Sequence, residues 1–358
     1  MPSAPRGTST HDGSVPSLTL PAPRTADPRD APPLRWGILA PGGIARSFAT
    51  ALRAGTGQHL QAVASRTFSR AQQFADDFGV TTAYGSYADL VADPDVDVVY
   101  VASPHSEHRA QAILATTAGK PVLVEKAFAR NATEARDIVE SAGAAGVFAM
   151  EAMWTRFLPH IDVVRRCLED GLLGEVHTVH ADHGQQLYPD GPPRLAEPAL
   201  AGGALLDLGV YPVSFAHFVL GDFADVTATG IRTESGVDAQ DAIAVTNSNG
   251  AMAVLGTTMV TRTPTVAAVC GTRARLEIDG PFYAPGAVVR LVGADGTELD
   301  RFSNPDTEHG LHFEAAEVAR RVTAGELESP LLPLVETLRI MDALDDVRAQ
   351  VGVRYPGE

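Results

Sequence analysis

Short apolar stretches alternate with longer amphipathic segments between about residues 34 and 150. The apolar stretches have the length of strands, and the segments between them repeat their apolar positions at helical spacing. Helices are predicted to end near residues 53, 79, 118 and 146, and strands are predicted at 34–40, 60–65, 95–102 and 121–125. Because apolar strands separated by helices are typical of parallel sheets covered on both faces, we expect a doubly wound α/β domain.

A different pattern begins at about residue 151. It predicts, in chain order, a helix at 161–170, a strand at 176–183, a Gly- and Pro-rich loop at 184–203, a buried segment at 204–220, strand-like stretches at 226–231, 242–246, 252–259, 266–270, 274–278 and 288–292, and helices at 314–321 and 333–351. Consecutive strands without helices between them indicate an antiparallel sheet. This part is therefore predicted to be an α+β domain on a largely antiparallel, open sheet.

The first 33 residues differ from both parts. They hold 8 of the 25 prolines, and their only large aliphatic side chains are Leu18 and Leu20. Such a segment buries too little apolar surface to offset the entropy lost on ordering, so we expect a disordered extension. The alternative is an arm that wraps a partner subunit. The predicted units are thus the extension 1–33, a first domain at 34–155 and a second domain at 156–358.

Composition narrows the possible partners. With Lys+Arg 28 against Asp+Glu 44, the net charge of −16 argues against a nucleic-acid or anionic-membrane partner, which would require a basic surface. Two cysteines cannot form a disulfide framework, so we expect a cytoplasmic protein. No apolar run was expected to approach the roughly 18 residues that span a bilayer.

Glycine is concentrated in the turn after the first predicted strand. Residues 41–44 read Pro-Gly-Gly-Ile and open a helix. Such a turn lets the backbone approach a pyrophosphate, which the free N–H groups at the helix start attract. We therefore expect Gly42, Gly43 and Ile44 to bind a dinucleotide. The alternative is a plain strand-to-helix turn, because Ala40 replaces the first glycine of the G-x-G-x-x-G pattern.

The residue types at the end of the second predicted strand indicate whether the cofactor is NAD or NADP. NAD binding requires an acidic residue here for the ribose hydroxyls, and none is present. Ser65, Arg66 and Arg70 stand there instead, and guanidinium groups suit the 2′-phosphate of NADP. NADP is therefore the predicted cofactor, although Arg70 could be a solvated helix residue.

Two histidines follow the third predicted strand, in the sequence Ser103-Pro104-His105-Ser106-Glu107-His108. The carboxyl ends of parallel strands are where such sheets bind ligands, so Ser103, Pro104, His105 and His108 are expected to contact the cofactor. No set of carboxylate or thiolate partners has ligand spacing, so no metal is expected.

Taken together, these motifs resemble the Gfo/Idh/MocA oxidoreductase family, and within it the dimeric dihydrodiol dehydrogenases that also act as NADP-dependent D-xylose dehydrogenases. The resemblance rests on the order and spacing of several stretches: 36–39 and 42–45, Ser103 to His108, Glu125-Lys126, 151–157 and 202–212. It implies a Rossmann domain, a second domain with an open sheet, and a homodimer or homotetramer formed through that sheet.

The resemblance also implies roles for individual residues. Lys126 is the catalytic lysine, Glu125 beside it belongs to the cofactor site, and Asp207 and Tyr211 are the polar residues of the second-domain motif. The expected substrate contacts are Trp154, Arg156 and His183. Core packing is the alternative for Trp154 and Tyr211, and a surface position is the alternative for Lys126.

Oxidation of a hydroxyl needs a hydride acceptor and a proton acceptor. A tyrosine is a poor base at neutral pH unless a nearby ammonium stabilises the phenolate, so we expect Lys126 to lower the pKa of Tyr211. Asp207 would orient the reacting groups. The sequence thus predicts an NADP-dependent oxidoreductase acting on an aldose or related cyclic polyol. The alternatives are a trans-dihydrodiol dehydrogenase, a keto-sugar reductase and a non-catalytic NADP-binding regulator.

Overall fold

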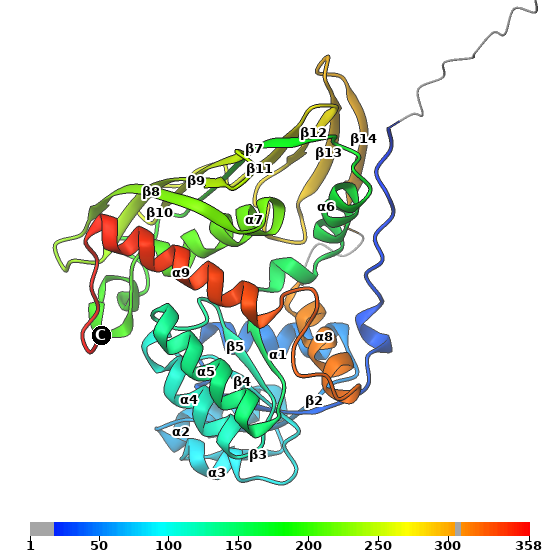
Figure 1. Cartoon of the computed structure of the whole chain (residues 1–358). Coiled ribbons are helices and arrows are strands. Elements are labelled where there is room, and N and C mark those ends of the chain that lie inside the picture. Colours follow the sequence, from blue (N-terminus) through cyan, green and yellow to red (C-terminus); the bar gives the residue numbers. More distant parts are fainter. Residues whose placement is uncertain (1–17, 305–308) are drawn as a thin grey trace, which may run out of the picture.

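Two sheets, with helices around and between them, organise the chain (Figure 1). The computed structural model describes residues 18–304 and 309–358. Its first sheet contains only parallel strands, in the spatial order β3-β2-β1-β4-β5-β6. These are β1 (Arg35–Leu39), β2 (His59–Ala64), β3 (Thr82–Tyr84), β4 (Val98–Val101), β5 (Val122–Glu125) and β6 (Ala149–Ala152). The predicted doubly wound α/β domain is confirmed.

Five helices accompany this sheet: α1 (Gly43–Gly55), α2 (Phe68–Phe78), α3 (Tyr87–Val91), α4 (His105–Thr117) and α5 (Ala132–Ala145). Strands β4 and β5 are buried at every position, as expected where helices cover both faces. Strand order reverses between β1 and β4, so the carboxyl ends of these neighbouring strands open a crevice for a ligand.

The second sheet has the order β14-β13-β12-β11-β7-β10-β9-β8. Only the pairing of β7 with β10 is parallel. The strands are β7 (Val176–Gly184), β8 (Phe223–Arg232), β9 (Asp238–Asn247), β10 (Met252–Thr258), β11 (Ala267–Gly271), β12 (Ala274–Ile278), β13 (Val288–Gly293) and β14 (Glu298–Ser303). The predicted, largely antiparallel sheet is therefore confirmed, with β14 added at one edge.

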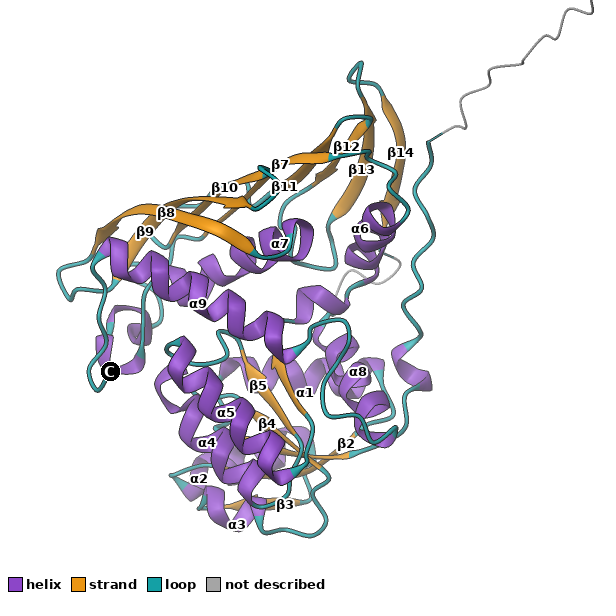
Figure 2. Cartoon of the chain, viewed as in Figure 1, coloured by secondary structure: helices purple, strands orange, loops and turns teal. Residues whose placement is uncertain are grey.

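Helices cover the face of the second sheet that looks toward the first domain (Figure 2). They are α6 (Pro159–Glu169), α7 (Val210–Leu220) and α9 (Leu334–Val351), and a further helix, α8 (Leu311–Thr323), packs on α1 of the first domain. Shorter helical turns lie at Pro28–Asp30, Trp154–Phe157, Pro193–Ala196, Pro198–Leu200 and Leu205–Gly209. The opposite face of the sheet carries no helix within the described ranges.

One helical stretch, Pro198–Leu220, is long and apolar enough to cross a membrane by length and composition alone. This corrects the expectation that no apolar run approaches that length. However, 89% of its most apolar window is buried inside the structure. Core helices that are surrounded by protein have the same composition, so this stretch packs as a helix of the second-domain core.

The expected disorder of residues 1–33 is wrong for residues 18–33, while residues 1–17 lie outside the described part of the chain. The segment runs along the second domain and reaches α8 (Figure 1). The N–H of Leu20 donates to Asp300 (2.9 Å), and the guanidinium of Arg24 pairs with Asp162 (3.1 Å) and Glu169 (2.8 Å). Ala31 is buried against two alanines of α8. The segment lacks an apolar pattern, and polar contacts with specific residues of the second domain hold it in place.

Removal of residues 1–33 should lower the free energy of unfolding relative to a chain that begins at residue 18. Asp162 would lose both the backbone and side-chain donors of Arg24. The surface of α8 against which Ala31 packs would be exposed to water. A loss of about 1–3 kcal/mol is expected, measured by urea denaturation. Equal stability of the two chains would show that the segment contributes nothing to folding.

Candidate active site

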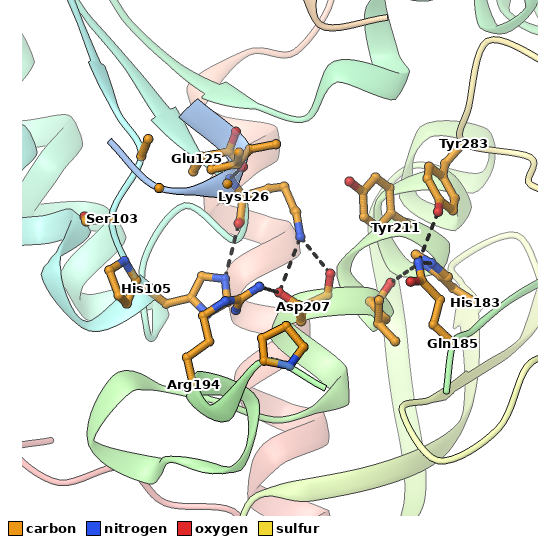
Figure 3. Close-up of a pocket in the computed structure, with 17 residues that line it drawn as sticks. Ser103, His105, Glu125, Lys126, His183, Gln185, Arg194, Asp207, Tyr211 and Tyr283 are labelled. Atoms are coloured by element: carbon orange, nitrogen blue, oxygen red, sulfur yellow. Dashed lines mark hydrogen bonds and ion pairs between the residues drawn. The ribbon is translucent and has the colours of Figure 1, made fainter. Parts of the chain in front are cut away.

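The carboxyl ends of three neighbouring strands meet the second domain at a cavity of about 510 Å³ (Figure 3). Strand β1 leads into the glycine turn, β4 into Ser103, and β5 into Lys126. The second domain closes the opposite side. The lining residues are Gly42, Gly43, Ile44, Ala102, Ser103, Pro104, His105, Glu125, Lys126, His183, Gln185, Pro192, Arg194, Asp207, Leu208, Tyr211 and Tyr283.

The glycine turn leaves space beside the start of α1. A side chain at Gly43 would meet nothing within 4 Å, and one at Gly42 would meet only the carbonyl of Ala40, at 3.9 Å. Ala40 itself has a φ of 65°, in the left-handed region that glycine adopts without cost. This turn therefore keeps the backbone shape of a glycine-rich loop despite the alanine, and its open side faces the cavity.

A second cavity of about 280 Å³ extends from the glycine turn along the end of β2. Ser65, Arg66 and Arg70 line it, as the sequence predicts, together with Tyr87. It shares Gly42, Ala102 and Pro104 with the first cavity, so the two form one elongated depression. Neither guanidinium pairs with a carboxylate of residues 18–304 or 309–358, which leaves both charges available to an anion.

The two predicted histidines differ in position. His105 lines the first cavity, whereas His108 is fully buried behind the cavity wall, which corrects the expectation that His108 contacts the cofactor. The ring nitrogens of His108 face the carbonyl oxygens of Ser103 (2.8 Å) and Ala127 (3.0 Å). Burial lowers the pKa of His108 to about 4, so the ring is neutral and donates to only one of these two carbonyl oxygens.

Two polar residues that the sequence assigns to the cofactor line the first cavity. Ser103 lines the first cavity, and its hydroxyl oxygen is buried without a hydrogen-bond partner among the described residues. Glu125 is buried and accepts hydrogen bonds from the hydroxyl of Tyr100 and the N–H of Lys126. A hydroxyl at the cavity wall that has no partner among the described residues remains available for a hydrogen bond with a ligand.

Lys126 joins the two domains. Its Nζ atom donates to the carbonyl oxygen of Asp207 (2.7 Å) and lies 3.8 Å from the Asp207 carboxylate. Arg194, from the loop after β7, donates to the same carboxylate at 2.9 Å. Burial alone raises the pKa of Asp207, but the charges of Lys126 and Arg194 outweigh it and bring the pKa to about 2. Asp207 is therefore ionised at every working pH.

Tyr211 lies one helical turn after Asp207 and faces the same cavity (Figure 3). Its hydroxyl accepts a hydrogen bond from the indole N–H of Trp154 (2.9 Å). Lys126 lies over the ring, with Nζ at 5.2 Å from the ring centroid. Burial raises the pKa of Tyr211 well above its ordinary value. This corrects the expectation of a phenolate stabilised by Lys126, because the structure favours a protonated tyrosine.

The three predicted substrate residues are separated by the structure. His183 lines the cavity, and Trp154 lines an adjoining cavity of about 490 Å³ that shares Lys126 and Tyr211. Arg156 lines neither. Its buried guanidinium pairs with Glu336 of α9 (2.8 Å), which corrects the expectation of a substrate contact. The Arg156 charge stabilises the packing of α9 instead.

Three lining residues had no signal in the sequence. Arg194 and Gln185 belong to the loop after β7, and Tyr283 follows β12. The amide of Gln185 donates to the hydroxyl of Tyr283 (3.2 Å), and the Tyr283 ring packs at 4.6 Å from that of Tyr211. Only the folding of the second sheet brings these loops to the cavity, so local pattern could not reveal them.

A nucleotide crevice, a partly buried lysine and a tyrosine–aspartate pair at one cavity define a nicotinamide-dependent oxidoreductase. The family model described as "Oxidoreductase family, NAD-binding Rossmann fold" matches residues 34–153, and the "GFO/IDH/MocA C-terminal domain" model matches residues 161–277. The trans-1,2-dihydrobenzene-1,2-diol dehydrogenase of Bos taurus is 36% identical over 335 residues, covering 90% of this chain and 98% of the bovine protein. The chain belongs to the Gfo/Idh/MocA family.

Solved structures agree with this assignment. KijD10, a 3-ketoreductase from Actinomadura kijaniata in complex with NADP and TDP-benzene, is 29% identical with a TM-score of 0.78, covering 89% of this chain and 98% of KijD10. The aldose-aldose oxidoreductase of Caulobacter crescentus has the same fold, with a TM-score of 0.82 at 24% identity, covering 90% and 98% of the two chains. The alternative of a non-catalytic regulator is thereby set aside.

Proposed function

We propose that the protein transfers hydride between NADP and a hydroxyl or carbonyl carbon of an aldose or related cyclic polyol. The observation that carries this proposal is the meeting of Lys126, Asp207 and Tyr211 at a cavity continuous with the arginine-lined depression at β2. Initial rates with NADP and NAD against a panel of aldoses, keto sugars and trans-diols test it directly. A chain that turns over none of these would overturn the proposal.

The residues along the depression fit a dinucleotide with a 2′-phosphate. Gly42 and Gly43 leave room for a pyrophosphate at the start of α1. Arg66 and Arg70 would hold the 2′-phosphate, since their guanidinium groups are exposed and their charges are not neutralised by nearby carboxylates. Ser103 and Glu125 would lie beside the nicotinamide end, next to Lys126.

Proton handling is the task of the chain's own residues. A bound nicotinamide supplies hydride transfer. Because the Tyr211 oxygen accepts from Trp154, its own proton is free to point toward a substrate oxygen in the cavity. The high pKa keeps that proton in place until negative charge develops on the substrate oxygen. Lys126 places a positive charge close to the position of that oxygen. Ionised Asp207 can accept a hydrogen bond from a neighbouring substrate hydroxyl.

The cavity walls suit a ring with polar edges. Tyr211, Tyr283 and His183 form an aromatic wall, with the His183 and Tyr283 rings 4.4 Å apart. Gln185 and Arg194 add hydrogen-bond donors at the rim. A sugar ring stacks on such a wall and satisfies the donors with its hydroxyls. A trans-dihydrodiol is the second candidate, favoured by the same aromatic wall and by the similarity to the bovine dehydrogenase.

We also propose that two copies join through the helix-free face of the second sheet. Met252 and Val254 of β10 are 46% and 50% exposed there. Val254 lies beside His180 of β7 and Ala244 of β9 in the strand register, so Met252 and Val254 form a small apolar pair among small and polar side chains. Contact with a second copy would remove this exposed pair from water. If so, Val254→Asp should shift the molecular mass from dimer toward monomer in analytical ultracentrifugation, whereas a monomeric wild type would contradict the proposal.

Cofactor preference is tested by Arg66→Ala. Loss of one phosphate-binding guanidinium should weaken NADP binding about 10-fold or more and leave NAD binding nearly unchanged, because NAD lacks the 2′-phosphate. Binding constants for both cofactors, measured by fluorescence titration, check this. Arg53→Ala, on α1 and outside the cavities, is the matched control. An equal loss for NADP and NAD would show that Arg66 does not read the 2′-phosphate.

The proton-transfer role is tested by Tyr211→Phe, which keeps the ring and removes the hydroxyl. General acid–base catalysis typically contributes about 10²–10⁴-fold, so kcat should fall by that order while NADP affinity is retained. Lys126→Ala should cost at least as much, and the double variant should be little worse than the poorer single variant. Tyr84→Phe in the first domain serves as the control. Wild-type turnover in Tyr211→Phe would reduce Tyr211 to a packing residue.

A further inference from the structure

The helix that carries Asp207 and Tyr211 begins at a buried acidic residue. The π-helical turn Leu205–Gly209 runs directly into α7, and the N–H of Leu205 donates to the Oδ2 atom of Asp238 at 2.5 Å. Asp238 is the first residue of β9 and is only 1% exposed. A free N–H at a helix start is stabilised by such an acceptor. The Asp238 contact therefore fixes where the helix begins, two residues before Asp207.

A second buried carboxyl group lies next to the first. Asp241, three residues further along β9, is 4% exposed. The Oδ1 atom of Asp238 and both carboxyl oxygens of Asp241 have no donor among the described residues. Two adjacent carboxylates without a donor repel each other, but one proton between them supplies the missing donor and removes one charge. The charge repulsion is relieved and a hydrogen-bond donor is present only when one of the two carboxyl groups is protonated.

Two glycines make room for these carboxyl groups. A Cβ atom at Gly203 would lie 2.2 Å from the Oδ1 atom of Asp238, and one at Gly230 would lie 2.2 Å from the Oδ1 atom of Asp241. Gly203 has a φ of 115°, which other residues rarely adopt. The chain thus encloses the pair tightly, with Gly203 at the entrance of the helix and Gly230 on the neighbouring strand β8.

Few other charged groups lie around the pair. From the C-terminal segment, Tyr355 faces it, and the Tyr355 hydroxyl donates to the carbonyl of Gly202 at 2.7 Å. Arg348 of α9 lies over the Tyr355 ring and pairs with Glu358. Arg232, opposite Asp238 in the register of β8, donates to the carbonyl of Gly352. No cation of the described residues forms an ion pair with either carboxyl group.

We propose that Asp238 and Asp241 share one proton and that this acid pair positions the helix bearing Asp207 and Tyr211 against Lys126. Neither residue touches the cavity, so both act as positioning residues. The helix is held at its start by Asp238 and, one residue before Gly203, by Tyr355. The catalytic part of the inference rests on the proposed function, whereas the shared proton does not.

The pair should make the protein sensitive to alkaline pH. Burial raises the pKa of both carboxyl groups, and the neighbouring charge adds to this for Asp241. An unfolded aspartate loses its proton near pH 4, while the folded pair keeps one proton until the pH reaches the raised pKa. Stability therefore falls as the pH rises through this window, because the folded state binds more protons than the unfolded state. Above it, two charged carboxylates would push Asp238 away from Leu205.

The test is Asp241→Asn, in which the amide N–H replaces the shared proton and cannot be lost. The melting temperature of the variant should fall less than that of the wild type between about pH 4 and about pH 9, the window that the ordinary aspartate pKa and the raised pKa of Asp241 set. The alkaline decline of kcat should move to higher pH. Asp225→Asn, an exposed position on β8, is the matched control and should keep the wild-type profile.

Positioning is tested by Asp238→Ala and its rescue. Loss of the acceptor should lower kcat about 10- to 100-fold through displacement of the helix, while NADP affinity stays within about twofold. Asp238→Asn should restore turnover, because its oxygen accepts from Leu205 and its N–H groups face Asp241.

Wild-type pH profiles in Asp241→Asn would overturn the proposal that the two carboxyl groups share a proton. Unchanged kcat in Asp238→Ala, or no rescue by asparagine, would overturn the positioning role. If the protein is inactive on every substrate tested, the result counts against the proposed function alone. The melting temperatures measured against pH still test whether the two carboxyl groups share a proton.

Discussion

The ammonium of Lys126, whose side chain is 14% exposed, links the two domains at the site. An ammonium removed from water is costly unless acceptors and an opposite charge surround it. The carbonyl and carboxylate of Asp207, at 2.7 and 3.8 Å from Nζ, supply both. The helix of the second domain must therefore lie against the end of β5, which in turn places Tyr211 over the lysine. Arg194 reaches the same carboxylate and holds the loop after β7 beside the cavity. Cavity shape and chemistry thus depend on this ionic contact, while the packing of α1 on α8 and of α5 on α9 also joins the two domains.

The backbone that carries the lysine is fixed by neutral histidines. His105 faces the carbonyl of Lys126 at 3.2 Å, and His108 faces that of Ala127 at 3.0 Å. Burial lowers the pKa of His105 to about 3, with the charge of Lys126 acting in the same direction. A protonated ring here would add a positive charge close to the Lys126 ammonium. Each neutral ring therefore donates one hydrogen bond, through one of its two nitrogens, and carries no charge that would compete for Asp207.

Local pattern was sufficient where a segment's burial is uniform or strictly periodic. The apolar strands that became β1, β2, β4 and β5 were predicted, whereas β3 has three half-buried residues at a sheet edge and β6 carries Glu151 at its centre, so neither stands out. The arm at residues 18–33 is held by long-range contacts such as Arg24 with Asp162, which composition cannot show. Motif order pointed to Lys126, Asp207 and Tyr211, which the structure brings to one cavity. Distances were needed to show that Arg156 faces Glu336 and that the hydroxyl of Tyr211 faces Trp154 and not the lysine.

The surroundings of the site shift the pKa values of its two acidic groups, Asp207 and Tyr211, in opposite directions. Asp207 sits between two cations and has a pKa of about 2, while Tyr211, four residues later, is buried with its oxygen toward an indole N–H and has a pKa well above 10. Groups whose environments move their pKa values apart take different chemical roles. The aspartate can only accept hydrogen bonds, and the tyrosine can only give up its proton to a strongly basic oxygen. An alkoxide developing during carbonyl reduction is such an oxygen, and the same tyrosine oxygen would take the proton back from the substrate hydroxyl in the reverse oxidation.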